Sequence, residues 1–407
     1  MPRSARVAIG FSNATHYLTH LFMLLYPTAV LGLEQEFHLP YGQLISLSLG
    51  GFILFGAGAL PAGWLADRWS EIGMLAVLLF GMGGAALLTG LAPSPLWVAL
   101  GLALMGLFAS IYHPVGIAMI VRHAEKRGRA LGINGVSGGL GLASGALVAG
   151  ALMDWWSWRA AFIVPGLVAM ALGVVFLVAV RLTGLRDTRE DAHPQPEVGG
   201  HAMVSAFLTL TVTTMMAGLI FQSTSVALPK IFAQRLGLFA GGNGALDVGG
   251  FVSLVYLGAA SVQVFGGILA DRFPLKWVYV AAYTVQVPVI LLAARLYNWP
   301  LVGVCMAMVL LQNGAAPAES ALYARYSPAR WRATAFGLKF VVSLGVSALG
   351  VPLVALIYDG TGGFYWLFVA MAAFALTAAS VGLLLPGERG LAATTPLPAG
   401  AAGGSDD

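Results

Sequence analysis

The hexapeptide GWLADR at Gly63–Arg68 recurs as GILADR at Gly267–Arg272. Further residues recur at almost the same spacing along the chain: Pro114 and Pro317, Arg122 and Arg325, Arg129 and Arg332, Asp154 and Asp359. A single echo can arise by chance, but several at nearly one offset indicate a duplication. The chain therefore reads as two homologous halves, with each hexapeptide at the end of the second helix of its half.

The composition around this repeat is that of a membrane protein. Of the 407 residues, 58% are hydrophobic and only 9% are charged, whereas soluble domains average roughly 45–50% and 25%. So few charges cannot cover the surface of a water-soluble protein of this size, so lipid must replace water over most of it. The formal net charge of +4 suits anionic lipid headgroups better than nucleic acid, and we expect no nucleic-acid partner.

Apolar runs long enough to span a bilayer recur through the whole chain. They predict an all-α membrane protein of about twelve transmembrane helices in two pseudo-symmetric six-helix halves. The runs lie near 7–32, 42–66, 72–92, 95–121, 130–152, 159–180, 203–229, 248–270, 276–296, 299–323, 334–358 and 363–386. The predicted divisions are an N-terminal bundle (1–181), a polar linker (182–202), a C-terminal bundle (203–387) and a disordered tail (388–407).

The distribution of basic residues predicts the orientation of the chain. Most of the 21 Lys and Arg residues fall in the segments that share a side with both termini. Cytoplasmic loops carry such an excess, so we expect both termini and the linker in the cytoplasm. The predicted location is a bacterial inner membrane, crossed many times.

The duplicated motif, the central linker and the helix count resemble the major facilitator superfamily over essentially the whole chain. A closer resemblance is to its fosmidomycin-resistance-like efflux branch. The matching pieces are Tyr26-Pro27, Glu36-Phe37, Tyr112-His113-Pro114, a glycine-rich fifth helix that ends in Asp154, and Trp158-Arg159. The chain differs from that branch at His16 and Val115, so no substrate is carried across.

The resemblance implies a gating role for the repeated motif. A carboxylate at a membrane edge needs a cation or a helix N-terminus as partner. We expect Asp67 and Asp271 to pair with Arg129 and Arg332, which begin the fifth helix of each half, and the pairs to break as the protein changes face. Arg68 and Arg272 belong to the same candidate gates. The alternative is a static staple between loops.

Three histidines are candidates for proton coupling. His16 and His20 share one face of the first helix, and His113 lies in the fourth. In the superfamily that the chain resembles, the first, fourth, seventh and tenth helices line the central cavity. Imidazole titrates near neutral pH and can carry protons. Helix-packing hydrogen bonds are the alternative. A zinc site is a weaker possibility, because no carboxylate follows in the local sequence, although a ligand from another helix is possible. We expect no metal site.

Glu319 is the carboxylate predicted to lie deepest in a helix, the tenth. A carboxyl group in an apolar surrounding can hold a proton near neutral pH, so Glu319 is the first choice for the coupling group. Lys339, the lysine predicted to lie inside a helix, can bind an anionic substrate, pair with Glu319 or extend toward the cytoplasm. A fixed ion pair with Lys339, or a position nearer the membrane edge, is the alternative for Glu319.

Several polar and aromatic side chains are candidates for the substrate site. Pro114 removes a backbone hydrogen bond from the fourth helix, so the preceding tyrosine and histidine are placed beside a predicted kink. Neutral polar side chains on the seventh and tenth helices would complete the cavity wall, unless they only join helices. The candidates are Tyr26, Tyr112, His113, Gln222, Asn313 and Lys339.

The predicted function is secondary active transport of a small organic molecule, by proton-coupled efflux. The sequence holds no phosphate-binding loop, hydrolase elbow or pair of catalytic carboxylates, so we expect no enzyme activity and no cofactor. Two alternatives stay open: import of an organic anion by proton symport, and a non-transporting membrane sensor or scaffold. The expected partners are the substrate, protons and membrane lipid, and the expected state is a monomer.

Overall fold

The computed structural model describes residues 1–187, 201–236, 244–326, 339 and 341–386. The first half consists of α1 (Arg3–Phe37), α2 (Tyr41–Ser46), α3 (Leu49–Ala57), α4 (Ala59–Arg68), α5 (Glu71–Gly90), α6 (Pro95–Ala109), α7 (Tyr112–His123), α8 (Arg127–Trp155) and α9 (Ala160–Thr183). The second half consists of α10 (His201–Arg235), α11 (Ala245–Arg272), α12 (Leu275–Ala293), α13 (Asn298–Tyr326), the short turns η3 (Val341–Gly345) and η4 (Val346–Leu349), α15 (Gly350–Thr361) and α16 (Tyr365–Gly382).

The helices have the length and composition of membrane spans. Within the described residues, nine are long and apolar enough to cross a bilayer, or ten if the bent pair Tyr41–Ala57 and Ala59–Arg68 is one span. Two further long helices, α1 and α11, lie outside this count, and both pack along α8. The apolar part of α11 that the structure describes, Ala245–Gly258, is shorter than a span. With these two, the described chain has twelve long helical segments, of which nine or ten have the length and composition of a span, where the sequence predicted about twelve. The all-helical membrane architecture expected from the sequence is therefore confirmed.

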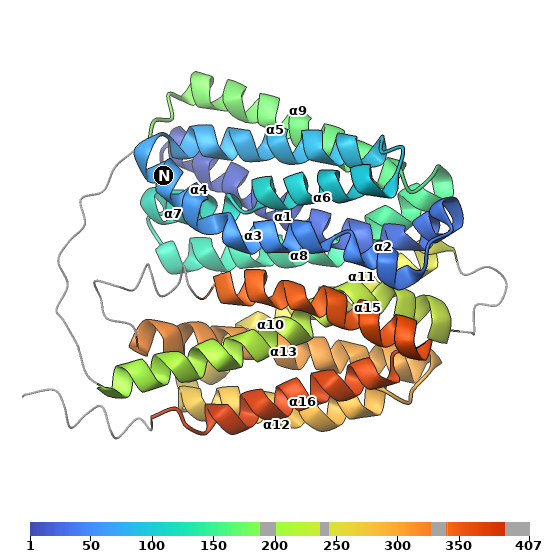
Figure 1. Ribbon diagram of the computed structural model, residues 1–407. Helices are drawn as coiled ribbons and strands as arrows, with labels where there is room; N and C mark the ends of the chain where they lie inside the picture. Colours follow the sequence, from blue (N-terminus) through green and yellow to red (C-terminus); the bar gives the residue numbers. More distant parts are fainter. Residues whose placement is uncertain (188–200, 237–243, 327–338, 340, 387–407) are drawn as a thin grey trace, which may run out of the picture.

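The helices run roughly parallel, and the two halves lie side by side (Figure 1). Packing between α8 and α11 forms a major part of the interface between them. The N-terminus lies at one end of the bundle. We call the opposite end the distal end. This end holds the C-terminal ends of α1 and α10 and the connections 38–40, 91–94, 156–159 and 294–297.

The outer surface is apolar, as contact with lipid requires. Helix α9 illustrates this, because Leu167, Val168 and Val175 each expose more than half of their surface. No layer of charged side chains covers them, since the described span of α9 has its basic residue, Arg181, in the last turn. Burying this surface in hydrocarbon is favourable.

The fourth span is interrupted at the predicted kink. Helix α6 ends at Ala109 and α7 begins at Tyr112, just before Pro114. Proline lacks the N–H that would bond to the carbonyl of Ser110, and the Ser110 hydroxyl bonds back to the carbonyl of Leu107 at 2.6 Å. The break places His113 in the first turn of α7. The predicted linker core (188–200) and tail (388–407) lie outside the described residues.

Candidate transport site

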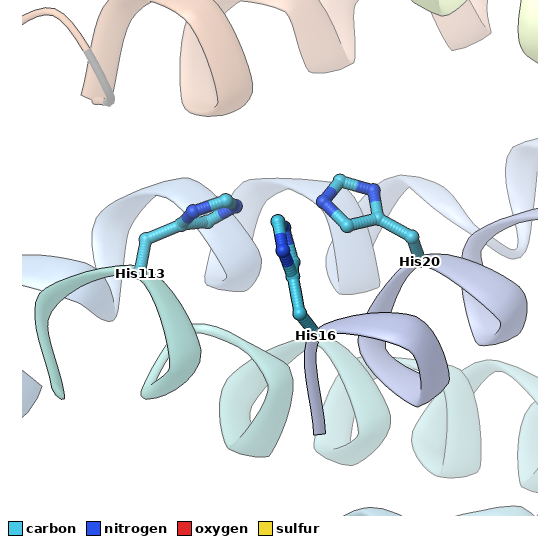
Figure 2. A group of neighbouring side chains, drawn as sticks. All are labelled: His16, His20 and His113. Atoms are coloured by element: carbon cyan, nitrogen blue, oxygen red, sulfur yellow. The ribbon is translucent and has the colours of Figure 1, made fainter. Parts of the chain in front are cut away.

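Three histidines from two helices converge inside the first half. His16 and His20 come from α1 and His113 from α7. Their ring centroids lie 4.7 Å apart for His16–His20 and 5.7 Å apart for each pair with His113. One nitrogen from each ring lies within 4.8 Å of the others. Figure 2 shows the rings of His113 and His20 turned toward each other, with the ring of His16 between them. We call these residues the histidine cluster.

Neighbouring side chains hold His16 in a defined orientation. Its Nδ1 donates to the main-chain carbonyl of Asn134 at 2.7 Å, and its ring stacks on Tyr112 at a centroid distance of 4.4 Å. The buried Asn134 amide in turn donates to the Tyr112 hydroxyl at 2.6 Å and to Asn13 Oδ1 at 3.0 Å. Helix α8 leaves room for the ring at Gly138, where a Cβ would lie 2.5 Å from Cε1 of His16.

An apolar pocket between α1, α3 and α6 adjoins the histidine cluster. Phe55, in its wall, lies 5.9 Å from the His113 ring centroid, and Thr19 precedes His20. Tyr26, one of the predicted substrate contacts, is also in the wall, and its hydroxyl donates to the carbonyl of Leu44. The pocket is lined by Thr19, Phe22, Met23, Tyr26, Ser48, Gly51, Phe52, Phe55, Leu102, Met105, Gly106 and Ala109.

Glu319 and Lys339 form an ion pair inside the second half. Their charged atoms lie 3.0 Å apart, and both side chains are about nine-tenths buried, at 10% and 11% exposure. Tyr279 donates its hydroxyl to the other carboxylate oxygen at 3.3 Å, and Lys339 also donates to Ser320 at 3.0 Å. The structure thus contains the ion pair with Lys339 that the sequence left open as the alternative role of Glu319. A role for Glu319 in carrying protons stays a prediction.

The remaining predicted substrate contacts lie on α10 and α13. The Gln222 side chain is buried, and its amide nitrogen has no hydrogen-bond partner among the described residues. Asn313 donates to the carbonyl of Val309 at 3.0 Å and accepts from Gln263 of α11 at 3.4 Å. Both positions face the interior of the second half, so the seventh and tenth spans carry polar groups inward.

The side chains proposed as gates in the repeated motif lie on the surface in this structure. Asp67, Arg129 and Asp271 are exposed, and the described ion pairs do not join Asp67 to Arg129. Arg68 lies over the Trp64 ring at 4.2 Å. Arg272, at the end of α11, is exposed as well, and Arg332 lies outside the described residues. The gating role of these residues stays a prediction.

The described polar contacts between the halves instead gather at the distal end, where sequence reasoning proposed no gate. Asp154 of α8 accepts from the main-chain amides of Ala245 and Leu246 at the start of α11, at 3.0 and 2.9 Å. Asp359 of α15 accepts from the main-chain amide of Gly42, at the start of α2, at 3.1 Å. In the sequence, the recurrence of Asp154 as Asp359 was the signal that could have identified these two aspartates, which cap helices of the opposite half.

Two further contacts close the same end. Lys230 of α10 bonds Glu34 of α1, with Nζ 2.6 and 2.8 Å from the carboxylate oxygens. Tyr41 is buried, donates to the carbonyl of Val226 at 3.0 Å and packs edge-on to Tyr358 at 4.9 Å. The halves are therefore held together at the distal end by ionic, capping and aromatic contacts.

Comparisons with a family model and with curated proteins point to one family of membrane proteins. The family model of the Major Facilitator Superfamily matches residues 14–253 and 210–403. A puromycin resistance protein of Streptomyces alboniger is 35% identical over 144 residues, which are 34% of this chain and 27% of that protein. A cephamycin export protein of Amycolatopsis lactamdurans is 31% identical over 172 residues, 40% of this chain and 33% of its own. The match thus spans a third or less of each relative.

Solved structures agree with the fold. A bacterial homologue of the human lysosomal transporter Spinster, inward-facing and unoccupied, has a TM-score of 0.73 at 15% identity and covers 94% of this chain and 95% of its own. A peptide transporter in complex with sulfate has a TM-score of 0.75 at 18% identity and covers 95% and 94%. At such low identity these likenesses establish the fold alone.

Proposed function

Because this chain belongs to the Major Facilitator Superfamily and is therefore a membrane transporter of a small molecule, we propose that it exports an apolar, partly aromatic organic compound in exchange for protons. The observation that carries this proposal is the pocket between α1, α3 and α6. Its wall is built from apolar and aromatic side chains with a few hydroxyl groups. Such a lining binds ligands by burying their apolar surface.

The relatives support export as the direction. Two of them are named for resistance to puromycin and for export of cephamycin. Membership of the fosmidomycin-resistance-like branch is a finer proposal, which the Tyr112-His113-Pro114 segment supports. We place the protein in a bacterial inner membrane with both termini in the cytoplasm, as the basic residues favour. The distal end then faces the periplasm.

Proton coupling is assigned to Glu319. In the structure the Glu319 carboxylate lies 3.0 Å from the ammonium group of Lys339. A proton bound by Glu319 would remove its charge and release Lys339, so the pair has two arrangements that differ by one proton. Rocking of the two halves would expose the pair alternately to each side.

The test is transport by the full-length protein in proteoliposomes with an imposed pH gradient, using an uncharged fluorescent aromatic compound as substrate. Glu319→Gln is expected to keep substrate exchange at equal pH but lose the acceleration by the gradient. Glu125→Gln, an exposed carboxylate beside the N-terminus, is the matched control and should behave as wild type. Gradient-driven transport that is unchanged in Glu319→Gln would remove the assigned role.

The second candidate is import of an organic anion together with a proton. It is favoured by the buried ammonium of Lys339, which would be free to bind a carboxylate once Glu319 is protonated. Growth of a deletion strain on organic acids, set beside its sensitivity to aromatic antibiotics, separates the two. Loss of growth with unchanged sensitivity would favour import over export.

A further inference from the structure

We propose that the histidine cluster is a binding site for a divalent transition-metal ion, of the class of Zn²⁺ or Co²⁺. The proposal does not rest on export or on proton coupling, because the cluster lies in the first half and Glu319 in the second. From the sequence a zinc site ranked low, because the sequence offered two histidines on one helix and left a third ligand from another helix open. The fold supplies that ligand as His113 from α7.

The geometry is close to what a metal needs. Imidazole is the commonest ligand for zinc, at about 2.0–2.1 Å from nitrogen to metal, so two ligand nitrogens lie at most about 4 Å apart. One nitrogen of each ring already lies within 4.8 Å of the other two. Small rotations of the side chains would bring all three to bonding distance. Figure 2 shows the three rings side by side, with the ring of His16 between those of His113 and His20.

The surroundings fix the tautomer that a ligand requires. Because Nδ1 of His16 donates to the carbonyl of Asn134 at 2.7 Å, the lone pair of a neutral His16 lies on Nε2. Metal-bound histidines use this arrangement, in which the second nitrogen donates to a carbonyl and fixes the ring. Tyr112 stacks on the same ring. His16 is thus held as a ligand would be, before any ion arrives.

A buried nitrogen in the cluster lacks a partner. Nδ1 of His20 is shielded from solvent and has no hydrogen-bond partner among the described residues. Buried polar atoms are nearly always satisfied, so a bound ion or its water would account for this atom. Three neutral imidazoles leave the ion one open position. An oxygen donor, from water or from a molecule in the adjoining pocket, would complete a tetrahedral site.

The experiment uses the full-length protein without a histidine tag, stripped with a chelator and titrated with Zn²⁺ by calorimetry and with Co²⁺ by visible absorption. We expect saturation at one ion per chain and the intense cobalt spectrum of a tetrahedral site. His20→Ala and His113→Ala should each weaken zinc binding tenfold or more. His38→Ala and His123→Ala, which change histidines outside the cluster, should bind zinc as wild type does.

Gly138→Ala keeps all three ligands and displaces only the His16 ring, so it should weaken zinc binding about 10- to 100-fold. The cobalt spectrum of the wild-type protein tests the site even if a histidine variant does not fold. The proposal is overturned if zinc binds without defined stoichiometry, if cobalt gives only the weak spectrum of a hydrated ion, or if the control variants lose binding as strongly as the cluster variants.

Discussion

At the scale of single residues, the ion pair between Glu319 and Lys339 shows how charge is accommodated inside a membrane span. Each charge is desolvated, and each is compensated by the other and by a hydroxyl, from Tyr279 or from Ser320. The two charged residues could be found from the sequence because they stand out in apolar runs. Tyr279 could not, since a tyrosine near the end of a span is ordinary and only packing between α12 and α13 brings it to the carboxylate.

Removal of one member of this pair should destabilise the protein strongly. Lys339→Met leaves a buried carboxylate unpaired, which costs about 3–5 kcal/mol, whereas the double variant Glu319→Gln with Lys339→Met leaves no buried charge. We expect the melting temperature in detergent to fall in the single variant and to recover most of the loss in the double variant. An additive loss in the double variant would show that the two side chains do not interact.

The glycine that accommodates the His16 ring gives a second prediction at this scale. Gly138→Ala places a methyl group 2.5 Å from the ring, and overpacking of this kind costs about 1–3 kcal/mol. At Gly132, on the same helix, a Cβ would meet no atom within 4 Å, so Gly132→Ala should be neutral or slightly stabilising. Thermal unfolding of both variants in one detergent checks the difference, and equal melting temperatures would contradict it.

At the scale of elements, the aspartates of α8 and α15 bind the N-terminal amides of helices in the opposite half. The exposed amides at a helix start carry a partial positive charge, so a carboxylate there is stabilising. The sequence showed that Asp154 and Asp359 recur, but not what they bind, because a main-chain amide leaves no trace in the residue type. The predicted partners of Asp67 and Asp271 were arginines, which are visible in a sequence.

Neutralising both caps should favour separation of the halves at the distal end. Asp154→Asn together with Asp359→Asn removes two carboxylate–helix contacts, each about 0.3–1 kcal/mol at an exposed site. Spin labels at Trp156→Cys and Arg295→Cys, both exposed positions at this end, should then report a larger population of long distances. Asp247→Asn, in the first turn of α11 without a described contact to the first half, should leave the distances unchanged.

At the scale of the whole molecule, the sequence predicted an all-helical membrane protein, because the hydropathy of a lipid-facing helix is a property of composition. It did not predict that the second span would bend between α3 and α4 by 43°, nor which end of the bundle would be closed. Which end is closed depends on contacts between residues far apart in the chain, such as Glu34 with Lys230 and Tyr41 with Tyr358.

Alternation between the two faces requires the distal contacts to break, which gives a prediction for the whole molecule. A bifunctional maleimide between Glu34→Cys and Lys230→Cys, which joins the two halves, should abolish transport in proteoliposomes. The same reagent between Glu36→Cys and Arg159→Cys should leave transport intact, because that ion pair, at 2.6 Å, lies within the first half. Full activity of the first cross-linked protein would exclude the rocking motion.

The contacts of Asp154 and Asp359 with main-chain amides also determine which amino-acid substitutions the distal end tolerates. Each carboxylate holds main-chain amides, which every residue except proline provides, so most mutations on the receiving side leave the bond intact. The vulnerable positions are the aspartates themselves and two glycines: a Cβ at Gly42 would lie 2.1 Å from the Asp359 carboxylate, and one at Gly244 would lie 2.5 Å from that of Asp154. These two carboxylate–amide contacts can therefore persist while the sequences of the surrounding loops change. Both halves of the duplicated chain can keep the contact without a matching substitution in a partner side chain.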